Sequence, residues 1–385
     1  MITRICIRNF KSLADVTFYP SHFTCLIGMN GAGKSTLLQA MDFISQLMKG
    51  RIQDWLDARG WKKSDLNCKL LRKRNIFISV DIDFGNGFPI TWCGDFNVNL
   101  MRMTNEMIID KGEPIFNVID GHYWISKDRS LKIAFDYEGS IFSVMKPEGL
   151  PRYIKELRSK IIDIGSLELL SPHLLRKKAR STEAGIGVGG EKLSAYLGTL
   201  SPEKRGRLAE ALRAFYPHLT DLNVSSLRAG WKKLAVLEEF GGRRLETEAA
   251  HMNDGMLRIL AVLTQLASGR SMVLLDEIEN GINQELIEIL VDTLVHSPHQ
   301  TMVTTHSPLI LNYLDDVVAK QAVQFVYKTP EGETRVRPFF SLDRMAEKLR
   351  TMGPGDAFVD TDLKRLTEEC IALDREEMRG AEIEK

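Results

Sequence analysis

The feature that most constrains the fold of this chain is a glycine-rich segment close to its amino terminus. Residues 28–36 have the sequence GMNGAGKST, which fits the pattern G-x-x-x-x-G-K-[ST]. The apolar run Phe23–Ile27 precedes this segment and predicts a buried strand. Apolar residues between 37 and 48 recur at helical spacing, and Gly50 is expected to end that helix. A strand, a glycine loop and a helix in this order predict the beginning of an α/β fold.

Such a loop is suited to hold the phosphate groups of a nucleotide. Small residues allow consecutive backbone N–H groups to turn toward phosphate oxygens, and the start of the following helix adds a partial positive charge. Lys34 can reach the β- and γ-phosphates, the Ser35 hydroxyl can take a Mg²⁺ ligand position, and Thr36 can contact the α-phosphate. The loop residues predicted to bind the nucleotide are Gly28, Asn30, Gly31, Gly33, Lys34, Ser35 and Thr36.

Two carboxylates follow a second predicted buried strand late in the chain. Met272–Leu275 is apolar, and Asp276 and Glu277 come directly after it. Asp276, at the strand end, suits a water-mediated ligand of Mg²⁺, and Glu277 suits a base that polarises an attacking water. A solvated acidic turn is the ordinary alternative. The glycine loop in the same chain favours the catalytic interpretation.

Two more motifs lie near this acidic pair. Residues 304–308, TTHSP, end another short predicted strand, and strand ends line the ligand crevice of a parallel sheet. His306 is therefore a candidate to hydrogen-bond the γ-phosphate or the attacking water. Residues 253–255, NDG, open an apolar helical segment, so Asn253 or Asp254 can cap that helix. The spacing alone favours the cap; the alternative is a helix start that docks on the γ-phosphate of a nucleotide held by another subunit.

The region between these motifs has a different texture. Five β-prone runs predict an antiparallel meander: Ile76–Ile82, Ile115–Ile119, Tyr123–Ile125, Leu131–Tyr137 and Ile141–Val144. Residues 151–216 have a mostly helical pattern, and residues 231–240 are strand-like again. We therefore predict four segments: the amino-terminal part of a nucleotide-binding head (1–74), an inserted β-meander and helical lobe (75–230), the carboxy-terminal part of the head with a hairpin near 323–336 (231–340), and a helical tail (341–385).

Composition and charge exclude several classes of protein. The chain has 385 residues, and about 150 residues per domain predicts two or three folding units. Lys and Arg number 51 and Asp and Glu also number 51, so a broadly basic DNA-coating protein is excluded. The five cysteines form no C-x-x-C pair, so we expect neither a disulfide framework nor a zinc site. Because the apolar runs are too short to span a bilayer and no signal peptide is visible, we expect a cytoplasmic protein.

Together these segments resemble the ABC-class ATPases of the RecF, SMC and OLD type, and more closely the stand-alone AAA/ABC-like ATPases of bacterial genomes and defence loci. Residues 5–13, ICIRNFKSL, are similar to the family's opening strand and its N-F-K-S turn. Residues 26–36 are similar to its Walker A motif, and residues 253–258, NDGMLR, to its S-D-G-x-x-R form of the ABC signature. Residues 274–280 resemble its Walker B motif and D-loop, and residues 304–308 its switch histidine. The five elements occur in the family's order and cover most of the chain.

The resemblance implies an ABC-type P-loop ATPase head with a mixed sheet, interrupted by a β-rich and then helical insertion. It implies ATP and Mg²⁺ as cofactors, with Ser35 and Asp276 as metal ligands. It also implies a homodimer that encloses ATP, in which the signature-like segment faces the nucleotide of the second subunit. The implied catalytic residues are Lys34, Glu277 and His306, and the nucleotide-binding residues added to the loop are Lys11, Ser12, Asn253, Asp254 and Gly255.

The chain departs from the family in several places. Asn253 stands where the family usually has Ser, no glutamine can be assigned to a Q-loop, and the transporter motif L-S-G-G-Q is absent. Gln39 and Gln46 are poor Q-loop candidates because they lie on the helix after the glycine loop. OLD nucleases carry a TOPRIM domain after the ATPase part, whereas the D-x-D-like residues 360–362 have no adequate domain around them. We therefore expect ATPase activity and no intrinsic nuclease activity.

Two functions stay open at this point. The first is an ATP-driven switch that dimerises and controls a separate effector, expected to be a nuclease, in bacterial antiphage defence. The second is a RecF-like DNA-binding ATPase of recombination or repair, since basic clusters can bind DNA phosphates, although charge runs are usually solvated surfaces. The three clusters are Lys69 with Arg72, Lys73 and Arg74; Arg176 with Lys177, Lys178 and Arg180; and Lys204 with Arg205 and Arg207. A scaffold without activity is disfavoured because Lys34, Asp276, Glu277 and His306 are all present.

Overall fold

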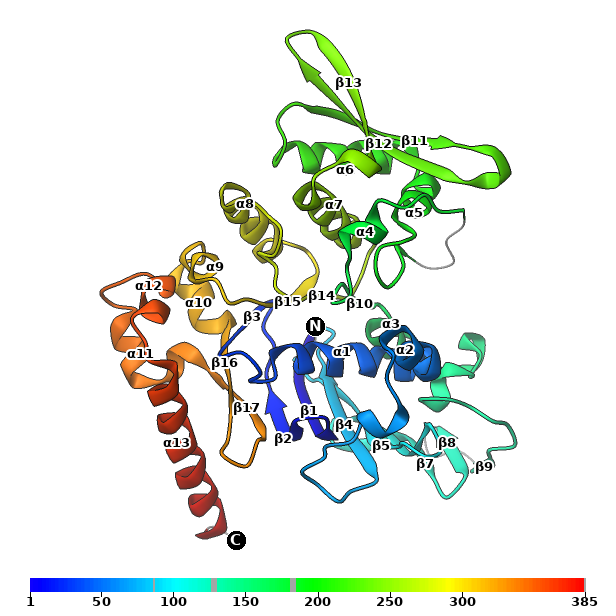
Figure 1. Cartoon of the computed structure of the whole chain (residues 1–385). Coiled ribbons are helices and arrows are strands. Elements are labelled where there is room, and N and C mark those ends of the chain that lie inside the picture. Colours follow the sequence, from blue (N-terminus) through cyan, green and yellow to red (C-terminus); the bar gives the residue numbers. More distant parts are fainter. Residues whose placement is uncertain (86, 126–129, 181–184, 384–385) are drawn as a thin grey trace. The chain divides into compact units, whose positions relative to one another are not determined.

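The computed structural model describes residues 1–85, 87–125, 130–180 and 185–383 (Figure 1). The chain divides into two compact units. The first unit is Met1–Ile164 together with His306–Lys385, and the second unit is Gly165–Thr305. The four segments expected from the sequence, with limits at 74, 230 and 340, stay a prediction.

The first unit contains an eight-stranded sheet with the strand order β2-β1-β4-β5-β6-β7-β8-β9. Neighbouring strands are antiparallel, which confirms the predicted meander and joins it to the amino-terminal hairpin through β1 and β4. Apolar residues at alternate positions of β4 are buried, namely Ile76, Ile78, Val80 and Ile82. The strands are β1 (Ile2–Phe10), β2 (Leu13–Phe18), β4 (Asn75–Ile82), β5 (Ile90–Asn97), β6 (Arg102–Asp110), β7 (Glu113–Ile119), β8 (His122–Ile125) and β9 (Leu131–Lys132).

Helix α1 (Lys34–Lys49) packs on this sheet through aromatic side chains. Phe43 of α1 stacks on Phe10 of β1 with ring centroids 5.2 Å apart, and it meets Phe96 of β5 edge-on, also at 5.2 Å. The helix ends at Gly50, which has the left-handed φ of 65° that a helix C-terminus favours. The predicted helix and its predicted end are therefore both confirmed.

A smaller group of strands in the first unit carries the segment before α1. Strand β3 (Phe23–Ile27) pairs in parallel with β16 (Val323–Lys328), and β17 (Thr334–Pro338) pairs antiparallel with β16, which confirms the predicted hairpin. Arg337 of β17 forms ion pairs of 2.6 Å with Asp374 and with Glu377, so the last helix is tied to this hairpin. The other helices of the unit are α2 (Ile52–Arg59), α3 (Arg152–Ile162), α9 (Pro308–Asn312), α10 (Asp316–Ala322), α11 (Asp343–Lys348), α12 (Pro354–Val359) and α13 (Leu363–Ile383).

The second unit combines a short parallel sheet with a separate antiparallel one. Strands β14 (Met272–Leu275) and β15 (Gln300–Thr304) are parallel, β10 (Ile164–Ser166) lies beside β14, and α8 (Gln284–Val295) connects β14 to β15. The antiparallel sheet has the order β11-β12-β13. Its strands are β11 (Leu219–Ser226), β12 (Lys232–Phe240) and β13 (Arg243–Glu248), and the remaining helices are α4 (Pro172–Leu175), α5 (Leu193–Thr199), α6 (Pro202–Arg213) and α7 (Asp254–Leu266).

Two of the five predicted β-runs differ in the structure. Ile141–Val144 is not a strand: residues Ile141–Ser143 form a short 3-10 helix, because the Ser140 side chain caps the N–H of Phe142. Of the run Leu131–Tyr137, only Leu131 and Lys132 form strand β9. Strands β5, β6, β11 and β13 were not predicted. In β5 the reason is Gly94, a poor strand former that is required because a Cβ there would lie 2.2 Å from Asn105 O of β6.

Candidate nucleotide-binding site

The glycine loop of the first unit joins the end of β3 to the start of α1. Gly28 has a φ of 143°, and a Cβ at this position would lie 2.1 Å from Val326 O of β16. Gly33 has a φ of 113°, and a Cβ there would lie 2.3 Å from the hydroxyl oxygen of Thr334. Neither position can carry a side chain, so the glycines that the motif requires are also required by the close approach of β16 and β17.

Thr334 fixes the loop from the side of β17. Its side chain is fully buried, and its Oγ1 lies 2.9 Å from Ala32 O and 2.8 Å from Ser12 Oγ. Its backbone N–H donates to Ser12 O at 2.9 Å. One threonine thus joins the glycine loop to the turn between β1 and β2, and it places Ser12 beside the loop. The sequence analysis did not find Thr334, because a threonine that opens a strand carries no signal of its own.

Lys34 is held over its own loop. The side chain is 5% exposed, and Nζ donates to Gly28 O at 2.9 Å and to Met29 O at 3.2 Å. The N-cap of α1 is Gly33, which offers no side-chain acceptor, and the first turn contains no acidic residue. A helix start with these properties fits an anion from outside the chain, so the residues present fit the phosphates of a nucleotide.

Lys11 lies against the second turn of α1. Its backbone has a φ of 49°, its Nζ donates to Gln39 Oε1 at 2.8 Å, and the same nitrogen lies 3.1 Å from the centre of the Trp61 ring. Arg59 approaches the same ring at 5.5 Å. The structure therefore gives Gln39 a local role as the acceptor for Lys11, beside a cation–π contact.

The acidic pair lies at the end of β14 in the second unit. Thr304, the last residue of β15, donates its hydroxyl to Asp276 Oδ1, and the N–H of Glu277 donates to Thr304 Oγ1 at 2.8 Å. Glu277 has a φ of 47°, a conformation that costs a residue other than glycine about 1–3 kcal/mol. Thr304 thus holds both backbone and carboxylate in place, while the Glu277 side chain stays exposed. The carboxylate of Asp276 offers the hard oxygen atoms that Mg²⁺ prefers as ligands.

The signature-like segment begins helix α7 in the second unit. Asn253 Oδ1 accepts the N–H of Met256 at 2.7 Å, so the capping interpretation is confirmed. A Cβ on Gly255 would lie 2.9 Å from Gly281 O, so this glycine is packed against the residue that directly follows the segment resembling the D-loop. Arg176 donates to Met252 O at 2.9 Å and to the carboxylate of Asp254. A role for Asn253, Asp254 and Gly255 toward a nucleotide stays a prediction.

His306 is the first residue of the carboxy-terminal part of the first unit, and its side chain is exposed. It directly precedes Ser307, the N-cap of α9. Of the basic clusters, Lys69, Arg72, Lys73 and Arg74 are exposed. In the third cluster, Arg205 donates a hydrogen bond to Leu200 O at 3.1 Å, and Arg207 forms an ion pair of 2.6 Å with Glu203. These two arginines therefore already make internal contacts.

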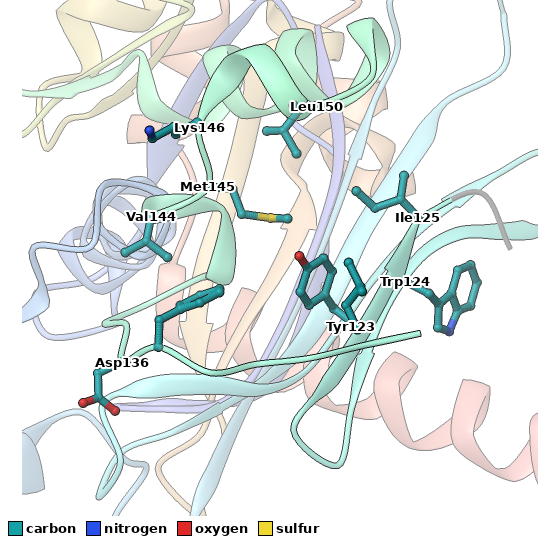
Figure 2. Close-up of a pocket in the computed structure, with 11 residues that line it drawn as sticks. Tyr123, Trp124, Ile125, Asp136, Val144, Met145, Lys146 and Leu150 are labelled. Carbon is teal, nitrogen blue, oxygen red and sulfur yellow. The ribbon is translucent and has the colours of Figure 1, made fainter. Parts of the chain in front are cut away.

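One cavity of the first unit is separate from these motifs. It has a volume of about 590 Å³ and lies in the first unit between β8 and the segment 144–150. Figure 2 shows Tyr123, Met145 and Leu150 around the hollow, with the charged ends of Asp136 and Lys146 at its margin. None of the residues predicted to bind the nucleotide lines it.

Comparison with known proteins gives the class of protein that this loop and fold define. Residues 1–169 match a family model described as "AAA ATPase domain", and residues 135–312 match one described as "AAA domain, putative AbiEii toxin, Type IV TA system". Both models describe AAA-type domains, and the resemblance seen in the sequence is confirmed.

Relatives and solved structures agree with this class. The chain is 31% identical over 104 residues to an OLD nuclease from Thermus scotoductus, a match that covers 27% of this chain and only 18% of that nuclease. It is also similar to the crystal structure of the Smc head bound to the C-winged helix domain of ScpA, with a TM-score of 0.51 and 16% identity over 87% of this chain and 96% of that one.

A second solved head supports the same fold. It is the Smc head domain with an extended coiled coil, bound to the C-terminal domain of ScpA, derived from Pyrococcus furiosus; the TM-score is 0.50 with 14% identity over 91% of this chain and 99% of that one. These likenesses confirm the predicted α/β fold with a mixed sheet of the ABC head type. Within the residues described, no helix is both long and apolar enough to cross a membrane.

Proposed function

We propose that the chain is an ATP-hydrolysing switch that dimerises around ATP and controls a separate effector protein. The observation that carries the proposal is the glycine loop, in which Gly28 and Gly33 leave no room for side chains and α1 begins without a side-chain cap. The match to ATPase domain models supports hydrolysis, and the match to the model that names a toxin system supports a place in antiphage defence. The expected location is the cytoplasm.

In this proposal Lys34 exchanges its contacts with Gly28 O and Met29 O for the β- and γ-phosphates. Ser35 supplies a hydroxyl ligand and Asp276 a water-mediated carboxylate for Mg²⁺, which when bound would neutralise phosphate charge. Glu277 takes a proton from the attacking water, and the bond from its backbone N–H to Thr304 fixes the backbone that carries this side chain. His306 would hydrogen-bond the γ-phosphate.

The dimer and the effector are supported by two kinds of observation. The start of α7, where Asn253, Asp254 and Gly255 resemble the ABC signature, is partly exposed and can meet the nucleotide of a second protomer. The two similar Smc heads were solved with domains of ScpA bound, which supports a partner-binding role for a head of this fold. We propose a nuclease as the effector, because part of this chain is similar to part of an OLD nuclease.

The test is the variant Glu277→Gln, which keeps the shape of the side chain and removes the base. We expect it to hydrolyse ATP at least about 100-fold more slowly and to accumulate as a dimer with ATP and Mg²⁺, measured by multi-angle light scattering. Glu285→Gln is the matched control, because Glu285 is an exposed acid in the first turn of α8. A Glu277→Gln protein that stays monomeric at saturating ATP would disprove the switch.

A second candidate function, DNA-dependent ATP hydrolysis, is favoured by one contact. Lys232 N donates to Ala179 O at 2.8 Å, which places Lys177, Lys178 and Arg180 beside the basic start of β12. DNA binding there would depend on phosphates and would weaken as salt is raised. DNA that stimulates ATP turnover of the native chain, but not of a Lys177→Ala, Lys178→Ala, Arg180→Ala triple variant, would favour this function over effector control.

A further inference from the structure

One arginine of the second basic cluster does not face solvent as its neighbours do. Arg176 follows α4, its side chain is 29% exposed, and its Nη2 donates both to Met252 O, at 2.9 Å, and to the carboxylate of Asp254. Lys177, Lys178 and Arg180 are exposed. The sequence suggests four equivalent cations, and the structure separates one of them by giving it a partner at the start of α7.

The partner creates an electrostatic conflict with the proposed function. Asp254 is the first residue of α7 and its side chain is 54% exposed. A carboxylate stabilises a helix start, but it repels any other anion that approaches the same place. A γ-phosphate that docks on residues 253–255 would therefore meet a negative charge, and a motif that includes this aspartate needs a nearby cation.

The backbone at this point cannot withdraw to resolve the conflict. A Cβ on Gly255 would lie 2.9 Å from Gly281 O, and one on Gly281 would lie 3.7 Å from the side chain of Arg258. Asn253 is fixed by its bond to Met256 N. Packing thus sets the position of Asp254 on the helix. Since Asp254 cannot move away from the docking point, a cation has to neutralise its charge.

We propose that Arg176 is a positioning residue that neutralises Asp254 and so allows the start of α7 to accept the γ-phosphate of ATP bound to a second copy of this chain. The inference rests on the proposed function, in which two protomers enclose ATP. Arg176 suits this role because its guanidinium has several donors: it can keep one bond to Met252 O while another N–H turns from Asp254 to the phosphate.

The experiment uses the full chain in the Glu277→Gln background, where the ATP-bound dimer is expected to accumulate. Arg176→Ala should weaken ATP-dependent dimerisation at least about 10-fold, because the carboxylate of Asp254 is then uncompensated. Adding Asp254→Asn to Arg176→Ala should restore dimerisation to within about 3-fold of the parent, since the charge that needed neutralising is gone. Arg243→Ala, an exposed arginine of β13 in the same unit, is the matched control and should leave dimerisation unchanged.

Two further measurements separate this role from a structural one. ATP binding to the monomer, measured by titration calorimetry below the dimerisation concentration, should be unchanged in Arg176→Ala, because the loop at Lys34 belongs to the first unit. Arg176→Lys, which keeps the charge, should retain dimerisation to within about 5-fold even if Arg176→Ala lowers the melting temperature.

The outcomes distinguish the inference from the proposal beneath it. If Glu277→Gln dimerises with ATP and Arg176→Ala dimerises equally well, the role of Arg176 is wrong and the switch stands. If Arg176→Ala is impaired but Asp254→Asn does not restore it, charge compensation is wrong and the arginine only supports the fold. If Glu277→Gln itself remains a monomer, the switch fails and the inference fails with it.

Discussion

The starts of α1 and α7 are both proposed to meet phosphate, yet the chain builds them in opposite ways. At α1 the N-cap is Gly33, which provides no side-chain acceptor, and the first residue is the cation Lys34. At α7 the N-cap is Asn253, whose side chain already accepts the N–H of Met256, and the first residue is the anion Asp254. The first start has no side-chain cap, whereas the second is capped by the side chain of Asn253.

The difference also explains where each helix is held. Beyond its start, α1 is held at its far end, where Ser140 N donates to Leu47 O at 2.8 Å and Gly50 closes the last turn. Ser140 in turn donates to the buried carboxylate of Glu106. Helix α7 is held at its beginning, by Asn253 and by the packing of Gly255. The polar contacts that support the two helices thus lie at different ends, and α1 also packs on the sheet through Phe43.

The largest effect is expected from a substitution of Lys34 that removes the cation at the start of α1. Lys34→Met keeps the length of the side chain and removes the charge, so ATP turnover should fall at least about 100-fold. The melting temperature should stay close to that of the native chain, since methionine fills the space of the lysine stem, although the bonds to Gly28 O and Met29 O are lost. Lys49→Met, in the last turn of the same helix, is the control and should keep turnover within about 2-fold. Comparable turnover in the two variants would contradict an α1 start built for phosphate.

The next effect concerns the loop backbone. Gly33→Ala forces a Cβ to within 2.3 Å of Thr334 Oγ1 at a φ of 113°, so the free energy of unfolding should fall by about 2–3 kcal/mol. Gly60→Ala, at the end of α2, has a comparable left-handed φ of 64° with open space around it, and should cost only about 1 kcal/mol. Urea denaturation of both variants measures the difference. Equal losses would mean that the contact with Thr334 does not constrain the loop.

The sequence revealed the elements that are strongly patterned. Phe23–Ile27 and Met272–Leu275 have the predicted bounds because continuous apolar runs are local properties. The residues of the glycine loop could also be identified from the sequence, because their types and spacing are specific to this motif. Both results came from windows of a few residues.

What the sequence could not supply are contacts between residues that are far apart in the chain. Thr334 bonds to Ala32 across 302 positions, and Arg176 to Asp254 across 78. Strand β1 pairs with β4 although α1 and α2 lie between them in the sequence, and no local pattern specifies such a register. For that reason the sequence alone suggests four similar charges in the basic cluster around Arg176, whereas the structure gives Arg176 a separate partner.

The support at the far end of α1 should depend on pH. Burial raises the pKa of Glu106 from 4.5 to about 7, although bonds from Ser140, Trp92 and Ile141 favour its charged form. Because the folded chain holds this proton more tightly than the unfolded chain does, its contribution to stability is present below pH 4.5 and is lost as the pH rises to about 7. Glu106→Gln does not ionise, so its free energy of unfolding should stay level between pH 5 and pH 8, while that of the native chain should fall by about 1–3 kcal/mol.

The measurement is urea denaturation at pH 5 and pH 8. The difference between the two chains should change in favour of Glu106→Gln from pH 5 to pH 8, because the native carboxyl is largely protonated at pH 5 in the folded chain. Glu113→Gln, on the exposed part of β7, is the control and should show no such dependence. A Glu106→Gln variant that follows the native chain at both pH values would show that this carboxyl does not limit the stability of the region that holds α1.

The smallest expected effect tests the start of α7, which the side chain of Asn253 caps. Asn253→Ala removes the acceptor for Met256 N and should lower the free energy of unfolding by about 1 kcal/mol, whereas Asn253→Ser, the residue usual in the resembled family, should cost only a few tenths of that. If the cap were the whole role of Asn253, both variants would dimerise with ATP as the native residue does, once stability is allowed for. We expect instead that Asn253→Ala, in the Glu277→Gln background, also weakens the ATP-bound dimer and that Asn253→Ser does not. An alanine variant that loses stability but dimerises normally would confine Asn253 to capping, and the contrast between the two helix starts would then be one of architecture alone.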